Sequence, residues 1–312
     1  MLAKLGNLED LKRKGFIFEP KLDGTRVLIF KKENSLKLIN RRGKNIIYRY
    51  PELNSIKNNI KENAVLDGEL VVLEKGKPSF QLLSEREHID SKLKIELKSE
   101  ISPATIFVFD ILQLGSKKLV NLPLIKRKEF LKRVLKENER IKLCFFTKRG
   151  LELWNSIKKM GLEGVVAKKE DSPYLFERSE FWLKIKNLKT LDCLICGYTT
   201  GTGKRKNFGS LILGCYYKGK LIYVGKVGTG FNEKEIKEIR KELEKIKGKI
   251  PFKEKPELDL PENRKPIWVK PKLICEVKFL ELSENLIMRA PSFLRIRNDK
   301  KPKDCILDYS NT

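Results

Sequence analysis

The chain has 312 residues, of which 40% are hydrophobic and 35% are charged. This is enough apolar material for one large or two ordinary domains, and it excludes a disordered chain. Lys and Arg outnumber Asp and Glu by 67 to 41, which gives a formal net charge of +26. A net positive charge of this size attracts polyanions, so nucleic acid is the expected partner. The alternative is that Lys-rich surfaces also occur in proteins from genomes of biased composition or from thermophiles.

Six cysteines are scattered along the chain, and the N-terminal residues show no secretory signal. Reduced thiols in a cytoplasmic protein are therefore expected. Cys193 and Cys196 form one CxxC pair, but no second pair follows at zinc-ribbon spacing, and the single histidine, His88, is distant. We expect the pair to be small buried side chains. No apolar run approaches the roughly 18 residues that cross a bilayer, which excludes a membrane protein.

Short strands separated by Gly, Asn and Pro turns are predicted from residue 16 onward. They cover residues 16–22, 25–32, 36–41, 64–74 and 105–114. Apolar residues at helical spacing predict helices over 125–138 and 151–161, and two more strands follow over 163–169 and 181–186. Strands interleaved with helices in this way indicate an α+β domain built on antiparallel sheet.

Past residue 188 the pattern changes to short strands with Gly-rich turns, which is typical of a small β-barrel. The strands cover residues 193–201, 210–217, 220–230 and 273–282. Asn232, with Glu235 three residues later, predicts a capped helix. Its apolar positions are Ile236, Ile239, Leu243 and Ile246. The proline-rich residues 251–271 predict an irregular connection. The expected domains are residues 1–188 and 189–312.

One short charged segment, EPKLDGTR at residues 19–26, interrupts the first predicted strands. Side chains two apart in a strand share a face, so Glu19, Lys21 and Asp23 place their charges on one side before Gly24 turns the chain. Alone, this KxDGxR pattern fits a solvated strand edge as well as an active site. The rest of the chain must decide between the two.

The ordered motif set of the chain resembles that of the covalent nucleotidyltransferases, and specifically the ATP-dependent DNA ligases. The motifs are KLDGTR (21–26), NRRG (40–43), LDGEL (66–70), FVFDIL (107–112), LEGVVAK (162–168), WLKIK (182–186) and RAPSFLRIRNDK (289–300). The last motif is highly specific to the ligase branch. The resemblance covers nearly the whole chain and implies a nucleotidyltransferase (adenylation) domain followed by an OB-fold β-barrel.

Within that branch, residues 78–90 and 197–231 are most similar to the ligase domain of bacterial and archaeal end-joining (LigD-type) ligases. Only about 20 residues precede Lys21. The sequence therefore predicts a minimal two-domain ligase without an additional N-terminal DNA-binding domain or a fused polymerase or nuclease.

The resemblance implies that Lys21 is the nucleophile that takes AMP from ATP. A lysine attacks phosphorus as its neutral amine, yet the reference pKa of lysine is about 10.4, so cations and desolvation must favour the neutral form. Lys184 and Lys186, on one strand face, are the expected catalytic cations; a basic edge for DNA backbone is their alternative. Glu69 and Glu163 are the implied ligands of Mg²⁺ or Mn²⁺, or else solvated strand residues.

Nucleotide recognition is implied for four residues. Phe109 would stack on adenine, Glu19 would accept a hydrogen bond from the adenine amino group, and Arg26 and Arg41 would contact sugar or phosphate. Phe109 also fits a buried core strand. The adjacent Arg42 leaves open which arginine has the motif role, although the family register favours Arg41.

The C-terminal motif is implied to act in the first step. A mobile barrel domain would bring Arg297, Asp299 and Lys300 over the pyrophosphate leaving group and then swing away. Lys168 ends its motif five residues after Glu163, so strand alternation places the two side chains on opposite faces. Lys168 is therefore given less weight as a site residue.

The resemblance thus implies an ATP-dependent DNA ligase that seals nicked or broken duplex DNA through lysyl-AMP and a DNA-adenylate, in DNA repair or end joining. Expected partners are the DNA and a Ku-type end-binding protein. A monomer in the cytoplasm, associated with the nucleoid, is expected. Two rivals remain: a GTP-dependent mRNA-capping guanylyltransferase, which lacks the last motif, and a non-catalytic nucleic-acid-binding module.

Overall fold

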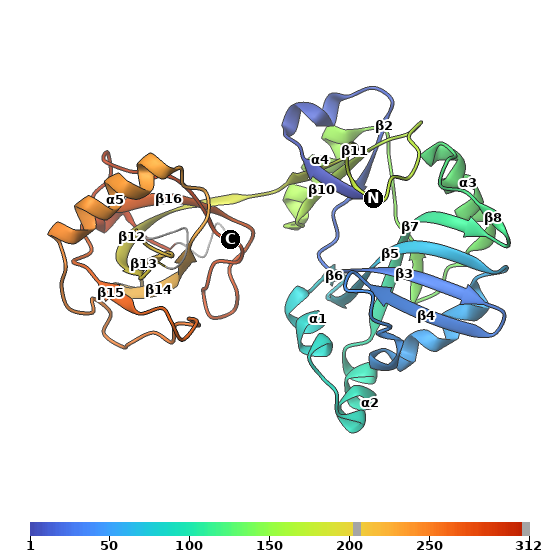
Figure 1. The fold of residues 1–312 in the computed structure, drawn as a ribbon, viewed down its shortest axis with the longest axis horizontal. Helices are drawn as coiled ribbons and strands as arrows, with labels where there is room; N and C mark the ends of the chain where they lie inside the picture. Colours follow the sequence, from blue (N-terminus) through green and yellow to red (C-terminus); the bar gives the residue numbers. More distant parts are fainter. Residues whose placement is uncertain (202–206, 308–312) are drawn as a thin grey trace. The chain divides into compact units, whose positions relative to one another are not determined.

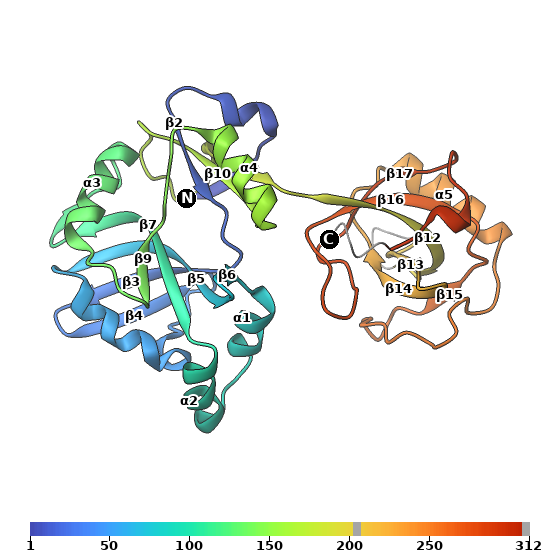
Figure 2. The same cartoon turned by 180° about the vertical axis from the view of Figure 1, so that it is seen from behind.

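The structure is a computed structural model that describes residues 1–201 and 207–307. It divides into two compact units, Met1–Asn187 and Leu188–Thr312, each with its own apolar core. Figures 1 and 2 show the strands and helices of each unit from two sides. The predicted fold class, an α+β domain with antiparallel sheet followed by a small barrel domain, is confirmed.

The first unit contains a large, mostly antiparallel sheet with strand order β4-β3-β5-β7-β8, in which β6 pairs with β5 and β9 with β7. The strands are β3 (Thr25–Lys32), β4 (Ser35–Asn40), β5 (Ala64–Glu74), β6 (Lys77–Pro78), β7 (Ala104–Leu114), β8 (Lys117–Lys118) and β9 (Ile141–Leu143). One face carries the main apolar core, including Val27, Ile29 and Leu66. Strand alternation leaves Arg26 and Leu28 on the other face.

A second, four-stranded sheet in the same unit has the order β1-β11-β10-β2. The strands are β1 (Leu2–Leu5), β2 (Phe16–Pro20), β10 (Gly164–Lys169) and β11 (Arg178–Lys186). β1 runs parallel to β11, and the other pairs are antiparallel. One face packs Phe18, Val165 and Ile185 against helix α4 (Gly150–Met160), which lies beside β10 in Figure 1. This packing accounts for the apolar alternation of these strands.

Three further helices belong to the first unit. They are α1 (Phe80–Glu87), α2 (Lys92–Ile101) and α3 (Leu124–Val134), with short 3-10 turns η1 (Leu8–Lys12), η2 (Ile47–Arg49) and η3 (Pro51–Asn59). The helix predicted over residues 125–138 is wrong at its end. Leu135 is extended (φ −96°, ψ 123°) and forms a β-bridge with Ile60, so pairing with a distant segment overrides the local helical pattern.

The second unit is the OB-fold domain, with a sheet of order β14-β13-β12-β16-β17 and β15 on β12. The strands are β12 (Lys189–Thr199), β13 (Leu211–Tyr217), β14 (Lys220–Val227), β15 (Pro266–Trp268), β16 (Ile274–Phe279) and β17 (Ser292–Ile296), followed by η4 (Pro302–Asp304). Helix α5 (Glu233–Lys245) begins with the predicted capping pair, since Asn232 and Glu235 bond each other's backbone N–H. Within the stretch predicted as irregular, β15 is a short strand.

All six cysteines are free and buried. Cys193 and Cys196 have no exposed surface, which confirms the prediction of small buried side chains. No helix in the described part of the chain is long and apolar enough to cross a bilayer.

Candidate active site

The four-stranded sheet separates charged from apolar side chains by strand alternation. In register, Val166 lies between Glu19 and Lys184, and Lys168 pairs with Trp182. Cross-strand partners share a face, so the side chains of these residues lie on the face opposite α4. The predicted residues of three separate motifs are therefore placed on one surface.

Lys21 follows directly after β2, and its backbone N–H donates to the carbonyl of Gly164 at 2.8 Å. Its Nζ lies 2.5 Å from Oε2 of Glu163, and Nζ of Lys186 lies 3.6 Å from Oε1 of the same carboxylate. Burial, with the neighbouring cations Lys186, Arg178 and Lys21, lowers the pKa of Lys184. The expected lysines surround the site, but a carboxylate lies between Lys21 and Lys186.

Gly164 makes this arrangement possible. Its φ is +150°, and a Cβ built there would lie 2.1 Å from the carbonyl oxygen of Ile185 on the neighbouring strand. Only glycine tolerates both the backbone conformation and the close approach. In the Glu-Gly pair of the motif, Glu163 thus supplies the carboxylate, and Gly164 allows β10 and β11 to pair beside Lys21.

Glu69 reaches the same region from the large sheet. It pairs with Arg26 across β3 and β5, and the charges of Lys21 and Glu163 both act on it. Burial, opposed in part by Lys21 and Arg26, raises the pKa of Glu69 to about 8.

The two carboxylates suit a hard divalent cation. No group of three or more His, Cys, Asp or Glu side chains within residues 1–201 and 207–307 could hold a metal ion. Mg²⁺ is commonly bound by one or two carboxylates together with substrate phosphates and water, and Glu69 and Glu163 fit that donor set.

A buried carboxyl with a raised pKa predicts a specific pH dependence. The folded protein holds a proton on Glu69 that the unfolded chain releases above its ordinary pKa near 4.5, so this group lowers stability as pH rises from about 4.5 to about 8. Without divalent metal, Glu69→Gln should be more stable than the parent at pH 9, by at most about 5 kcal/mol, and similar to it at pH 5. Urea unfolding in EDTA measures this. Glu74→Gln, on the exposed end of β5, should show no such trend.

Two aromatic rings lie between the sheets. Phe109 is 8% exposed, and its ring meets that of Trp182 edge-on at 5.8 Å. Nζ of Lys168 lies 4.1 Å and 4.0 Å from the two ring centroids. In the described part of the chain, Nε1 of Trp182 is buried with no hydrogen-bond partner. A buried donor without a partner suits a ligand that carries acceptor atoms, as a purine nucleotide does.

The predicted arginines are in different situations. Arg26 makes a two-point ion pair with Asp67, at 2.9 and 2.6 Å, and donates to the hydroxyl of Tyr174 at 2.9 Å. Its guanidinium is thus held by protein groups on the face between the sheets. Arg41 and Arg42 are both exposed in the turn after β4. Their exposure does not distinguish between them.

Glu19 has two lysine partners, which the sequence did not indicate. Lys168 lies 2.7 Å from Oε2 of Glu19, and Lys128, from α3, binds Oε1. Strand alternation counted from Glu163 places Lys168 on the opposite face, but Glu163 precedes β10 and is not part of the strand. Counted within the strand, Lys168 shares a face with Val166. Lys128 is 109 residues from Glu19, and no local pattern points to it.

The residues of the C-terminal motif lie together within the second unit. Arg297 binds Asp192 at 2.9 Å and Asp299 at 2.7 Å, and Nζ of Lys300 lies 3.7 Å from Asp192. The hydrogen bonds from Arg297 hold the pKa of Asp299 below its usual value. The three predicted residues therefore form one ion-pair network around Asp192.

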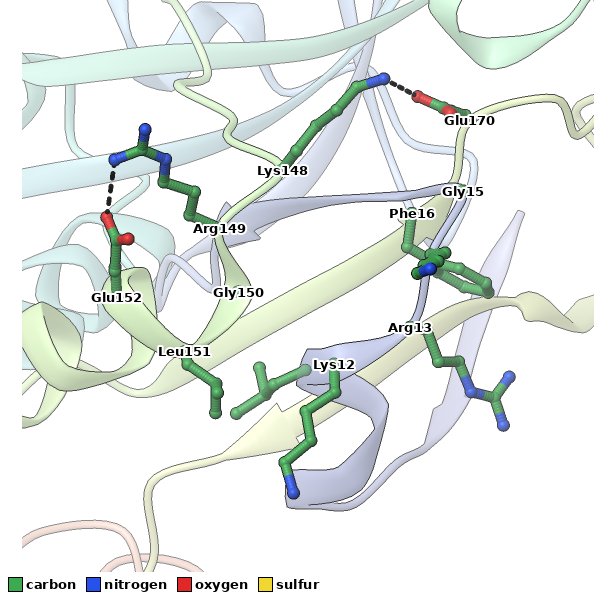
Figure 3. Close-up of a pocket in the computed structure, with 12 residues that line it drawn as sticks. Lys12, Arg13, Gly15, Phe16, Lys148, Arg149, Gly150, Leu151, Glu152 and Glu170 are labelled. Atoms are coloured by element: carbon green, nitrogen blue, oxygen red, sulfur yellow. Dashed lines mark hydrogen bonds and ion pairs between the residues drawn. The ribbon is translucent and has the colours of Figure 1, made fainter.

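A separate pocket of about 490 Å³ lies at the start of β2, the opposite end from Lys21. It is lined by residues 11–16 and 148–152 and by Glu170 (Figure 3). Lys148 pairs with Glu170 at 2.9 Å, and Arg149 with Glu152 at 3.3 Å. None of the predicted site residues lines this pocket.

Comparison with known proteins gives consistent matches. Residues 1–186 match the family described as "ATP dependent DNA ligase domain", and residues 204–300 match the "ATP dependent DNA ligase C terminal region". The chain is 32% identical over 312 residues to the "Multifunctional non-homologous end joining protein LigD" of Mycolicibacterium smegmatis, covering 98% of this chain and 39% of that protein. It is 33% identical over 315 residues to "DNA ligase 2" of Methanosarcina acetivorans, covering 93% and 53% respectively. The chain thus spans about half or less of the length of these relatives.

Among solved structures, "mycobacterial DNA ligase D complexed with ATP and MES" matches with a TM-score of 0.54 and 28% identity, covering 99% of this chain and 97% of that one. "Pmar-Lig_PreS3" has a TM-score of 0.70 at 19% identity, covering 95% and 67%, and shows a similar fold. Residues 202–206, within one of the segments similar to end-joining ligases, lie outside the described residues. The family match over residues 1–186 covers more than half of the chain, and the chain belongs to the ATP-dependent DNA ligase family.

Proposed function

We propose that this protein is an ATP-dependent DNA ligase that seals nicked or broken duplex DNA in repair or end joining. The observation that carries the proposal is the cluster of Lys21, Glu163 and Lys186 on the charged face of the four-stranded sheet. An amine beside carboxylates that suit a divalent cation, between flanking lysines, is equipped for nucleotidyl transfer. Glu69 supplies the second carboxylate from the other sheet.

The reaction proceeds in three steps. Nζ of Lys21 attacks the α-phosphorus of ATP; a nitrogen–phosphorus bond forms, the bond to pyrophosphate breaks, and the amine gives up its proton. An oxygen of the DNA 5′-phosphate then displaces Lys21 from AMP. Finally the 3′-hydroxyl attacks the 5′-phosphate, and AMP leaves as the strand is joined.

The lysines and glutamates have distinct tasks in this scheme. Lys21 must give up a proton before its amine can attack, because an ammonium has no free electron pair. Lys184 and Lys186 spread the negative charge of the triphosphate. A divalent cation, when bound by Glu69 and Glu163, supplies further positive charge to the phosphates. Arg297, Asp299 and Lys300 act on the pyrophosphate in the first step.

The remaining parts of the proposal concern partners. The net charge of +26 favours contacts with the DNA backbone that do not depend on base sequence. Nicked or broken duplex DNA is the substrate, and a Ku-type end-binding protein is a partner. Relatives named for non-homologous end joining support this view. A monomer located in the cytoplasm with the nucleoid completes the proposal.

The two rivals are not favoured. A GTP-dependent capping enzyme shares the lysine motif, but both matched families are ATP-dependent ligases. A non-catalytic binding module would not require the ion pairs that join Lys21, Glu163 and Lys186.

The test is incubation with α-labelled ATP and Mg²⁺, followed by nicked duplex DNA. The expected result is label on the protein that transfers to DNA and is then released as the nick is sealed. Labelled GTP should give no adduct, and EDTA should prevent adduct formation. Absence of protein-bound label with ATP and metal would refute the proposed function.

A further inference from the structure

Three charged side chains are buried together where the two sheets of the first unit meet. Glu19 on β2 is 2% exposed, Lys168 on β10 is 3% exposed and Lys128 on α3 is 6% exposed. Each lysine binds a different oxygen of the Glu19 carboxylate, Lys168 at 2.7 Å. Because α3 packs on β7 of the large sheet, Lys128 connects that sheet with β2 of the small one.

Two lysines around one carboxylate are one basic group more than Glu19 can neutralise, and burial, opposed in part by Glu19, lowers the pKa of Lys168. Burying charge is costly, and one lysine would be enough to neutralise Glu19. Aromatic faces ease the cost in part, since Lys168 lies over Phe109 and Trp182 and Lys128 lies 5.1 Å from the centroid of Phe146. A second lysine therefore needs a reason beyond structural neutralisation.

The effect of two lysines is to keep Glu19 ionised. Burial alone raises the pKa of Glu19, but the charges and hydrogen bonds of Lys128 and Lys168 outweigh it, and the net pKa is below the usual value. The third titratable group facing Glu19 is the thiol of Cys144, whose pKa burial raises to about 12, so it stays neutral. The titration of Glu19 is thus governed by the two lysines.

An ionised carboxylate accepts hydrogen bonds and donates none. Each oxygen of Glu19 accepts from one lysine, and the Cys144 thiol also hydrogen-bonds this carboxylate. Because a carboxylate has about four lone-pair sites, it has the capacity to accept a further hydrogen bond from a ligand donor. A 6-amino group on a purine is such a donor, whereas a 6-oxo group is an acceptor. The partnerless Nε1 of Trp182, beside Lys168, also indicates that hydrogen bonding in this cluster is incomplete without a ligand.

We propose that Lys128 is a positioning residue that fixes the Glu19 carboxylate in its acceptor-only form, so that the site selects purine nucleoside triphosphates carrying a 6-amino group. This inference rests on the proposed function, because it assigns base selectivity to the same nucleotide site. Lys128 itself touches Glu19 and not the reacting atoms.

The test compares ATP with purine riboside triphosphate, which lacks the 6-amino group, as donors for the lysyl adduct. A hydrogen bond to a charged acceptor predicts a preference of about 10- to 100-fold in kcat/KM for ATP in the parent protein. Lys128→Met, similar in length but uncharged, should reduce the preference to a few-fold at pH 6. Lys128→Arg should keep it, and so should Lys132→Met, an exposed control on the same helix.

The pH profile separates positioning from a merely structural role. The measured quantity is the ratio of kcat/KM for ATP to kcat/KM for purine riboside triphosphate. Protonation of Lys21 cancels in this ratio, since both nucleotides react with the same amine. Loss of one lysine raises the pKa of Glu19, so the ATP preference of Lys128→Met should fall further as pH is lowered and recover as pH rises. Between pH 6 and pH 9 the ratio should change less in the parent protein than in Lys128→Met.

The outcomes are distinguishable. If Lys128→Met keeps the parent ratio at every pH, the inference is overturned while the proposed function stands. If that variant does not fold, Lys128→Gln, which retains a hydrogen-bond donor without charge, must show the same loss of preference; an unchanged ratio overturns the inference. If the parent protein forms no adduct with either nucleotide, the proposed function fails and this inference with it.

Discussion

Lys21→Arg is expected to reduce AMP transfer to the protein by more than about 10⁴-fold, to below detection. Arginine keeps the positive charge beside Glu163, so the ion pair and the local fold remain, but the guanidinium does not deprotonate to a nucleophile. Intact-protein mass spectrometry after incubation with ATP and Mg²⁺ measures the adduct. Peptide mapping of the parent protein should locate the added AMP on Lys21.

Two controls make this prediction specific. Lys37→Arg, an exposed lysine on β4, should form the adduct at the parent level. Binding of Lys21→Arg to nicked duplex DNA should be unchanged, since the net charge is the same. An adduct at full level in Lys21→Arg, or AMP mapped to another residue of the parent protein, would show that Lys21 is not the nucleophile.

Lys300→Ala is expected to slow the first step by about 10²- to 10³-fold, the usual loss when one electrostatic contact to a developing charge is removed. Sealing of a nick that already carries AMP should change little, because pyrophosphate takes no part in it. Single-turnover adenylylation, followed separately by sealing of a synthetic pre-adenylylated nick, measures the two effects.

The matched control is Lys303→Ala, which removes an exposed lysine three residues away. It should leave both rates at the parent level. Equal losses in adenylylation and in sealing by Lys300→Ala would contradict a role limited to the pyrophosphate step. Thermal unfolding of each variant shows whether the network around Asp192 survives the substitution.

Much of the charged surface is predictable from strand alternation. Glu19 and Lys21 are two residues apart, as are Lys184 and Lys186, so each pair was expected to share a face before any partner was known. Motif order then indicated that these strands meet. The capped helix α5 was also predictable, since Asn232 and Glu235 interact over one turn.

The residues that escaped prediction depend on long-range geometry. Lys128 meets Glu19 only because α3 packs against β7, and nothing in the helix sequence distinguishes it from the exposed Lys132. Strand alternation counted from Glu163 fails for Lys168, because Gly164, with φ +150°, stands between Glu163 and the regular part of β10. The ion pair of Arg26 with Asp67 likewise joins neighbouring strands in a way that composition does not reveal.

The four-stranded sheet has one charged face and one apolar face that packs on α4. Its strands therefore tolerate no change in length. Deleting or inserting a single residue within β2, β10 or β11 would turn lysines and glutamates toward α4 and expose phenylalanine and valine at the reaction centre. Catalysis and folding would be lost together. Indels should therefore survive selection in the connecting turns, whereas these three strands keep a constant length.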